Sequence, residues 1–248
     1  MPHSPLPQRD ESFATPVDAP MYGPLPTIYR DVVFNYVYFT TDPQNVAPLL
    51  PAPFKPGEGG LCVAFSIEVP FSSSYGPFNE MGVVVQAFFQ GEAVFFLPSL
   101  YLDNDSAVAA GREIYGSPKK MAEVRLEHRG EVFVGTCIRS GIEIMQITTR
   151  TLTPAKAEEF IPVFPVYNLK MIPSVDKPEP AIKQITCTGV DNAETHWLYR
   201  CAGSVRFSPT VAGDFWKLVP KEIIGASRSA MDYEQGYGQV VYDYLAGS

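Results

Sequence analysis

The chain has 248 residues, of which 46% are hydrophobic and only 19% are charged. This length is enough for a sizeable buried core in one or two domains. The formal net charge of −8 at pH 7 disfavours nucleic acid or an anionic membrane as a partner, because like charges repel each other.

The sequence has no pattern typical of secretion or membrane insertion. No N-terminal apolar run follows a basic segment, and no stretch approaches the roughly 18 consecutive apolar residues of a membrane span. The four cysteines are widely spaced and form no C-x-x-C motif, which favours reduced and mostly buried thiols. We therefore expect a soluble, cytoplasmic protein.

The first 27 residues differ from the rest of the chain. Residues 1–27 are rich in proline and show no hydrophobic periodicity, which predicts an extended N-terminal arm. We expect the Met21-Tyr22 end of this arm to pack on the body of the protein. No stretch inside residues 28–245 has the composition of a linker, so residues 28–248 are predicted to form a single domain.

The first half of this domain consists of short apolar segments separated by polar or glycine-containing turns. Two short helices are expected, over residues 44–50, with Asp42 as N-cap and Pro43 at the first helical position, and over residues 105–113. The expected strands cover residues 32–39, 61–69, 82–89 and 93–102.

The second half shows the same strand-like alternation. A short helix is expected over residues 153–160, a long irregular crossing over the proline-rich residues 161–180, and another helix near residues 211–218. The expected strands cover residues 122–127, 131–139, 142–151, 181–189, 196–207, 221–229 and 238–245. This order predicts a mainly β (α+β) fold, a closed or nearly closed antiparallel β-barrel with a flanking sheet.

Three linked motifs carry the functional signal. Tyr101-Leu102-Asp103-Asn104 is followed by Gly111-Arg112-Glu113 and then by Pro118-Lys119-Lys120. In this order they resemble the signature region of the acetoacetate decarboxylase family, and a weaker resemblance extends from about residue 33 to residues 241–245. The resemblance implies the fold of that family and a homo-oligomer.

The resemblance also implies that Lys119, the first lysine of the Pro-Lys-Lys run, forms a Schiff base with the substrate. An amine must be neutral to attack a carbonyl, whereas a free lysine has a pKa of about 10.4. Burial or a neighbouring cation favours the neutral amine, and acetoacetate decarboxylase is itself a standard example of such activation. If residues 118–120 are extended, Lys120 points away from Lys119, which favours burial as the cause.

Further pocket residues follow from the resemblance. The family has an active-site glutamate before the strand at residues 82–89, where Glu80 lies in this chain. A second acidic position of the family falls near Ser66, and Glu68, on the same face of an alternating strand, is a candidate to replace it. A family arginine matches Arg30 only with a one-residue offset; facing the pocket, Arg30 would bind a substrate carboxylate.

The neighbours of the lysine allow two interpretations each. Arg112 and Glu113 either form structural ion pairs, or they orient the Lys119 loop and line the entrance to a pocket. Tyr115 is either an ordinary packing residue or a hydroxyl donor in the substrate site. His3, His128 and His196 are interpreted as non-catalytic. Because no glycine-rich phosphate loop, Ser/His/Asp set or metal-ligand cluster is visible, we expect no cofactor and no metal.

The resulting hypothesis is a Schiff-base lyase that decarboxylates a small β-keto acid such as acetoacetate through Lys119. The iminium accepts the electrons of the broken bond and gives an enamine, which is protonated and hydrolysed. Because the same enamine can attack an aldehyde, an aldolase or dehydratase that uses the same lysine is the alternative. A non-catalytic barrel that binds a small molecule is a third interpretation, from another class of protein.

Overall fold

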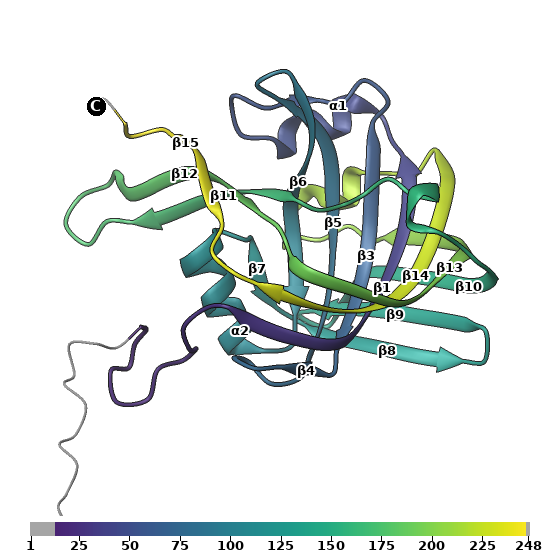
Figure 1. Ribbon diagram of the computed structural model, residues 1–248. Helices are drawn as coiled ribbons and strands as arrows, with labels where there is room; N and C mark the ends of the chain where they lie inside the picture. Colours follow the sequence, from purple (N-terminus) through teal and green to yellow (C-terminus); the bar gives the residue numbers. More distant parts are fainter. Residues whose placement is uncertain (1–12, 247–248) are drawn as a thin grey trace, which may run out of the picture.

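The computed structural model describes residues 13–246 (Figure 1). His3 and the first twelve residues of the predicted arm lie outside this range. Of the rest of the arm, Tyr22 packs on the body: its side chain is buried, and its hydroxyl donates a hydrogen bond to the carboxylate of Glu113. Met21 is exposed.

Fifteen strands of the described residues form one mixed sheet. Its main path runs β15-β12-β11-β6-β5-β3-β1-β14-β13-β10-β9-β8, with β2, β4 and β7 paired to β5, β1 and β6. The bounds are β1 Thr27–Thr40, β2 Lys55–Pro56, β3 Leu61–Val69, β4 Phe71–Ser72, β5 Phe78–Phe89, β6 Glu92–Leu102, β7 Lys119–Met121, β8 Glu123–Arg129, β9 Val132–Arg139, β10 Ile142–Pro154, β11 Val166–Pro173, β12 Pro180–Thr188, β13 Asp191–Phe207, β14 Glu222–Gln235 and β15 Gln239–Asp243.

The mainly β fold class is confirmed, but closure of the sheet into an antiparallel barrel is not. Within the described residues β15 and β8 are the two ends of the path and do not pair. Two pairings, β6 with β7 and β6 with β11, are parallel. Strand propensity is a local property, whereas closure depends on pairing between strands that are distant in sequence, so the pattern of apolar residues did not decide it.

The helical turns are short. Asp42 caps the first of them as predicted: its side chain accepts a hydrogen bond from the backbone N–H of Gln44 at 3.0 Å, and Pro43 begins the helix. Asn104 caps α2 in the same way. The bounds are α1 Pro43–Val46, η2 Ala47–Leu49, α2 Asp105–Ala110, the π-helical turn η3 Gly111–Tyr115, η4 Ala157–Glu159 and η5 Asp214–Lys217.

Two predicted elements in the second half are wrong. Strand β10 continues to Pro154, and only the turn η4 remains of the helix expected over residues 153–160. The crossing expected over residues 161–180 contains β11, which pairs with β12 and β6. Its prolines lie on either side of residues 166–172, so the backbone N–H groups of this stretch are free to pair. Figure 1 shows β11, β12 and β15 side by side at one end of the sheet.

Strand β1 is buried on both faces and separates two hydrophobic clusters. Phe34 and Tyr38 belong to one cluster, while Val37 and Phe39 belong to the other. Successive side chains of a strand point to opposite faces of a sheet, so one strand contributes to both clusters. This alternation decides which residues of each strand reach the functional site.

The segment after β13 packs against the cluster that contains Val37 and Phe39. Phe215 in η5 is fully buried, with its ring centroid 5.7 Å from that of Tyr101 and 5.6 Å from that of Phe207. The hydroxyl of Tyr101 donates a 3.2 Å hydrogen bond to the carbonyl of Ala212. These contacts hold the segment against β6. No helix among residues 13–246 is both long and apolar enough to cross a membrane.

Replacement of Phe215 by alanine tests how much its packing contributes to stability. We expect Phe215→Ala to lower the free energy of unfolding by about 3–5 kcal/mol, because a large buried ring is lost and leaves a cavity. Urea unfolding measures the change. Phe71→Ala is the matched control, since Phe71 is 50% exposed and its loss should have little effect. Equal losses in the two variants would contradict this account of the core.

Candidate active site

A small cavity opens on one face of the central strands. It is lined by residues of β1, β3, β5, β6, β7 and β14 and by the chain around residues 163–166. The interior of the cavity has a volume of about 80 Å³ and is open to solvent at its mouth. An interior of about 80 Å³ is larger than the roughly 10–15 Å³ that a single water needs, so the cavity is large enough for a small molecule.

Most of the lining is apolar. Aromatic and aliphatic side chains from the central strands form the walls. Lys119 and Glu80 are the only side chains with a formal charge among the described residues that line the cavity. Any charge that a ligand brings into this space therefore meets one amine and one carboxylate.

Lys119 and Glu80 form an ion pair inside the cavity. The Nζ atom of Lys119 lies 3.5 Å from Oε2 of Glu80, and both side chains are only 15% exposed. This carboxylate oxygen is buried and accepts no hydrogen bond within the described structure. The Lys119 amine also lies 5.7 Å from the ring centroid of Phe78. The two candidate catalytic residues predicted from the sequence are thus brought together.

Strand β6 explains how residues 39 positions apart in the chain meet (119 minus 80). On one side of β6, Glu80 of β5 pairs with Leu102 in antiparallel register. On the other side, Lys119 of β7 pairs with Leu100 in parallel register. Leu100 and Leu102 are two residues apart, so their partners lie at nearly the same height on either side of β6.

A tight loop delivers Lys119 to β7. The π-helical turn Gly111–Tyr115 ends at Gly116, whose φ of +76° favours glycine. The backbone N–H of Ser117 donates a 2.9 Å hydrogen bond to the carbonyl of Gly111. Arg112 lies outside the cavity and donates from Nη1 to the carbonyl of Lys119 at 3.2 Å. The contact of Arg112 is therefore with the lysine backbone.

Tyr115 lines the cavity, but its hydroxyl is already used. It donates a 2.9 Å hydrogen bond to the carbonyl of Gly236. Burial raises the pKa of Tyr115, and it does the same for Tyr29 and Tyr233, which line the same cavity. All three phenols are therefore protonated at neutral pH.

Tyr29 and Tyr233 also line the cavity and were not among the predicted site residues. Their rings stack with centroids 4.6 Å apart, from strands β1 and β14. Aromatic residues in a strand pattern are typical of ordinary core packing, so the sequence offers no separate signal for them. In addition, β14 extends to Gln235, beyond the predicted end at residue 229, and Tyr233 lies in this extension.

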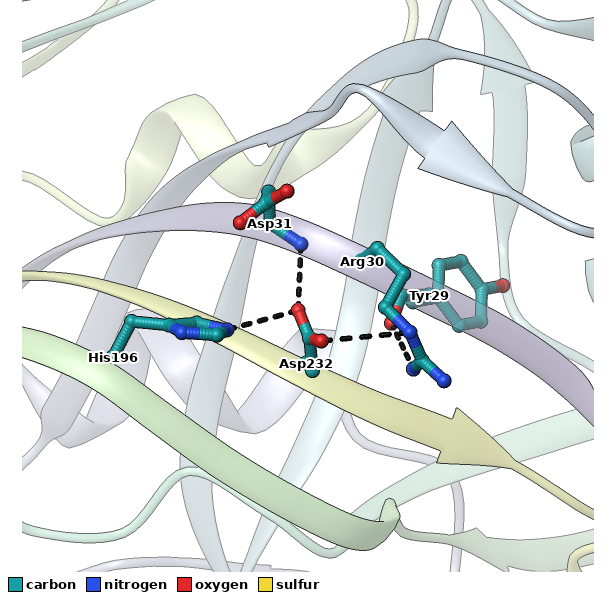
Figure 2. Close-up of polar contacts among 5 residues, drawn as sticks. All are labelled: Tyr29, Arg30, Asp31, His196 and Asp232. Atoms are coloured by element: carbon teal, nitrogen blue, oxygen red, sulfur yellow. Dashed lines mark hydrogen bonds and ion pairs between the residues drawn. The ribbon is translucent and has the colours of Figure 1, made fainter.

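Arg30 lies outside the cavity. Its Nε atom is 3.4 Å from Oδ2 of Asp232, its Nη1 donates to the carbonyl of Tyr29 at 2.9 Å, and its side chain is 44% exposed (Figure 2). The preceding residue, Tyr29, faces the cavity instead. Neighbouring side chains of a strand point to opposite faces, so a one-residue offset places Arg30 on the wrong side to bind a substrate there.

Asp232 is the centre of a small polar cluster around Arg30. Its Oδ1 atom accepts a 2.8 Å hydrogen bond from the backbone N–H of Asp31 and lies 2.9 Å from Nε2 of His196 (Figure 2). Ligand-type atoms of Asp31, His196 and Asp232 lie within 4.8 Å of one another, a grouping of β1, β13 and β14 that the sequence spacing did not reveal. Both oxygens of Asp232 already face protein groups, and the charge of Arg30 opposes a cation.

Glu68 also lies outside the cavity. Its Oε2 atom is 3.1 Å from Nε2 of His128. Ser66 shares a face with Glu68, as the alternation predicts, but Phe65 and Ile67 are the β3 residues that line the cavity. Ile67 is the cross-strand partner of Glu80. The position beside Glu80 on β3 is thus apolar, and Glu80 has no second carboxylate next to it there.

Lys120 points away from Lys119, as an extended β7 predicts. Its Nζ donates a 2.6 Å hydrogen bond to the carbonyl of Ala212, the group that Tyr101 also contacts. Burial lowers the pKa of Lys120, and the charges of Arg139 and Arg112 add to the effect. Lys120 therefore helps to hold the segment after β13 in place through the carbonyl of Ala212.

The fold and the site together define a mainly β protein that presents one lysine and one glutamate to a small apolar cavity. The chain belongs to the acetoacetate decarboxylase family, whose model matches residues 11–245. The resemblance recognised in the sequence motifs is therefore confirmed.

Individual relatives agree with this assignment. The chain is 27% identical to acetoacetate decarboxylase 1 of Bradyrhizobium diazoefficiens, over 96% of each chain. Its fold is similar to the crystal structure of acetoacetate decarboxylase from Legionella pneumophila, with a TM-score of 0.87, 28% identity and coverage of 99% of this chain and 100% of that one. It also resembles the enduracididine biosynthesis enzyme MppR, with a TM-score of 0.80, 16% identity and coverage of 98% and 100%. At this identity the likeness to MppR is one of fold.

The placement of Lys120 generates a prediction. We expect Lys120→Met to leave covalent trapping of a ketone at Lys119 largely intact, because the two side chains lie on opposite faces of β7. The variant should be less stable, since the Ala212 carbonyl loses a donor. Borohydride trapping followed by peptide mass mapping measures the first effect, and thermal unfolding the second. Loss of trapping in a folded Lys120→Met protein would show that Lys119 depends on the Lys120 charge.

Proposed function

We propose that the protein is a Schiff-base-forming lyase that decarboxylates a small β-keto acid such as acetoacetate through Lys119. The observation that carries this proposal is the 3.5 Å pair of Lys119 and Glu80 inside the small apolar cavity. Family membership supports the same reaction class. The small interior of about 80 Å³ favours a small substrate such as acetoacetate.

The reaction begins at the amine. Lys119 first gives up the proton that it carries in the ion pair with Glu80, and the neutral amine attacks the ketone carbon. Protonation of the hydroxyl group and loss of water then give a protonated imine. The bond between the α-carbon and the carboxylate then breaks, its electron pair moves into the iminium, and carbon dioxide leaves. The resulting enamine takes a proton at the α-carbon. Water finally hydrolyses the new iminium, which releases the ketone and restores the amine.

Glu80 favours this sequence through its charge. A carboxylate beside the iminium stabilises the positive charge that forms on Lys119. The same carboxylate repels the carboxylate of the substrate, and loss of carbon dioxide relieves that repulsion. Because Arg30 lies outside, the described lining offers no second cation that would stabilise the substrate carboxylate in the ground state.

Proton movement has two candidate sources in the cavity. Glu80 is within reach of the Lys119 amine and can hold or pass a proton during imine formation and hydrolysis. The phenol of Tyr233 stays protonated at neutral pH and so can donate a hydrogen bond to a bound carbonyl oxygen, whereas the Tyr29 hydroxyl donates a 3.4 Å hydrogen bond to Oε1 of Gln235. A cavity with one amine, one carboxylate and a neutral donor therefore contains the groups that the reaction needs.

A second candidate is an aldolase or dehydratase that uses the same lysine. The position of Arg30 favours it, because a cavity without a second cation is also suited to an uncharged carbonyl substrate. A fold relative at low identity, MppR, is described in complex with the condensation product of pyruvate and imidazole 4-carboxaldehyde. In this reaction the enamine on Lys119 attacks an aldehyde instead of taking up a proton.

Covalent trapping tests the proposal directly. We expect borohydride added with acetoacetate to inactivate the enzyme and to add mass to the peptide that contains Lys119. Unreduced enzyme should release carbon dioxide from acetoacetate faster than it condenses pyruvate or acetone with an aldehyde. The Lys119→Met variant is the control and should show neither trapping nor turnover.

The outcomes distinguish the three functional hypotheses: a decarboxylase, an aldolase or dehydratase, and a non-catalytic binding protein. Trapping at Lys119 with condensation product but no carbon dioxide release would replace the decarboxylase by the aldolase. Absence of any adduct in the folded protein would leave a non-catalytic binding protein. An adduct only on Lys120 would overturn the assignment of the nucleophile.

Replacement of Glu80 tests the role of the carboxylate. Glu80→Gln keeps the shape of the side chain and removes its charge, so we expect turnover to fall at least about 100-fold, the scale of a positioned acid–base group, while the Schiff base still forms. Carbon dioxide release and borohydride trapping, measured on the same samples, give the two quantities. Glu68→Gln is the matched control, because Glu68 faces His128 outside the cavity. Normal turnover of Glu80→Gln would contradict the proposed role.

A further inference from the structure

We propose that Gly111 is a positioning residue for Lys119: the absence of a side chain at this position gives the lysine stem its path to Glu80. The inference rests on the proposed function, because it concerns the position of the Lys119 amine that would form the Schiff base. Figure 1 shows α2 beside β7. Gly111 begins the π-helical turn that follows α2, and Lys119 is the first residue of β7.

The distances show how closely the lysine lies on the glycine. A Cβ atom built on Gly111 would be 2.3 Å from Cδ of Lys119, 2.8 Å from Cε and 3.2 Å from Cγ. Real Cβ atoms essentially never approach other heavy atoms closer than 3.0 Å. Three consecutive carbons of the lysine stem therefore occupy the space that any other residue at position 111 would need.

The backbone conformation does not require glycine at position 111. Its φ of −59° and ψ of −41° are ordinary helical values that every L-residue adopts. Glycine is unfavourable at such a position compared with alanine, because it loses more conformational freedom on folding. Gly116, five residues later, is different, since its φ of +76° itself favours glycine. The contact with Lys119 is thus the structural reason for glycine at 111.

Neither backbone is free to move away from this contact. The N–H of Gly111 donates to the carbonyls of Ala107 and Val108, and its carbonyl accepts a 2.9 Å hydrogen bond from Ser117. On the other side, the N–H of Lys119 donates to the carbonyl of Ser117 at 2.8 Å, and β7 is paired with β6. The flexible lysine stem is therefore the part that would yield to an added methyl group.

A shifted stem has a specific chemical consequence. The Nζ atom lies at the end of the stem, so a displacement at Cδ or Cε moves the amine away from its place beside Glu80. Misplacement of a reacting group by about 1 Å can cost on the order of 100-fold in rate. We therefore expect the Gly111→Ala protein to fold, but with the Lys119 amine displaced from its position beside Glu80.

The first experiment measures the amine itself. The rate of borohydride trapping with acetoacetate, followed by mass mapping of Lys119, should fall about 100-fold in Gly111→Ala, with a parallel fall in kcat. Gly59→Ala is the matched control, because a Cβ at Gly59 meets nothing within 4 Å, and it should behave as the parent. Trapping of Gly111→Ala at the parent rate would overturn the inference. Failure to trap the parent would instead overturn the proposed function.

The second experiment shows that the conflict is with the lysine side chain. Gly111→Ala should lower Tm in the parent but should leave it unchanged or raise it in a Lys119→Ala background, where the stem is absent. Such coupling between two neighbouring sites is not expected of an unrelated folding defect. If Gly111→Ala alone fails to fold, a folded double variant supports the inference. An equal loss of Tm in both backgrounds contradicts it.

Discussion

The ion pair of Lys119 and Glu80 places a primary amine and one carboxylate 3.5 Å apart in an apolar cavity. Two opposite charges with little water around them are stable only when their positions are fixed, because their mutual attraction must compensate for the solvation that both have lost. Strand β6 supplies that constraint, since it pairs with β5 on one side and β7 on the other. The loop before β7 and the contact of the lysine stem with Gly111 then set the direction of the stem.

The alternation of side chains across the sheet decides the rest of the site. Tyr29 faces the cavity while Arg30 faces Asp232, and Ile67 faces the cavity while Glu68 faces His128. In the same way Lys119 and Lys120 diverge from β7. One charged residue of each neighbouring pair is thus removed from the cavity, and the chemistry is left to Lys119 and Glu80.

Much of the local structure could be predicted because it depends on neighbouring residues. The strand at residues 61–69 has the predicted bounds, and Asp42 caps α1, because apolar runs and capping side chains act over a few residues. The strand β11 and the open sheet could not be predicted in this way. Both depend on partners far along the chain, and the prolines around residues 166–172 resemble those of an irregular loop.

The sequence by itself determined the family, the nucleophile candidate and the glutamate that belongs with it, since all three are carried by residue types in linear order around Lys119 and Glu80. It could not place Arg30 or Glu68, because a shift of one residue reverses the face of a strand and no linear pattern records that shift. Only the tertiary structure decided that Ile67 rather than an acidic side chain lies beside Glu80, and that Gly111 lies under the lysine stem. Both facts depend on the register of paired strands and the packing of a loop, which are properties of the folded chain.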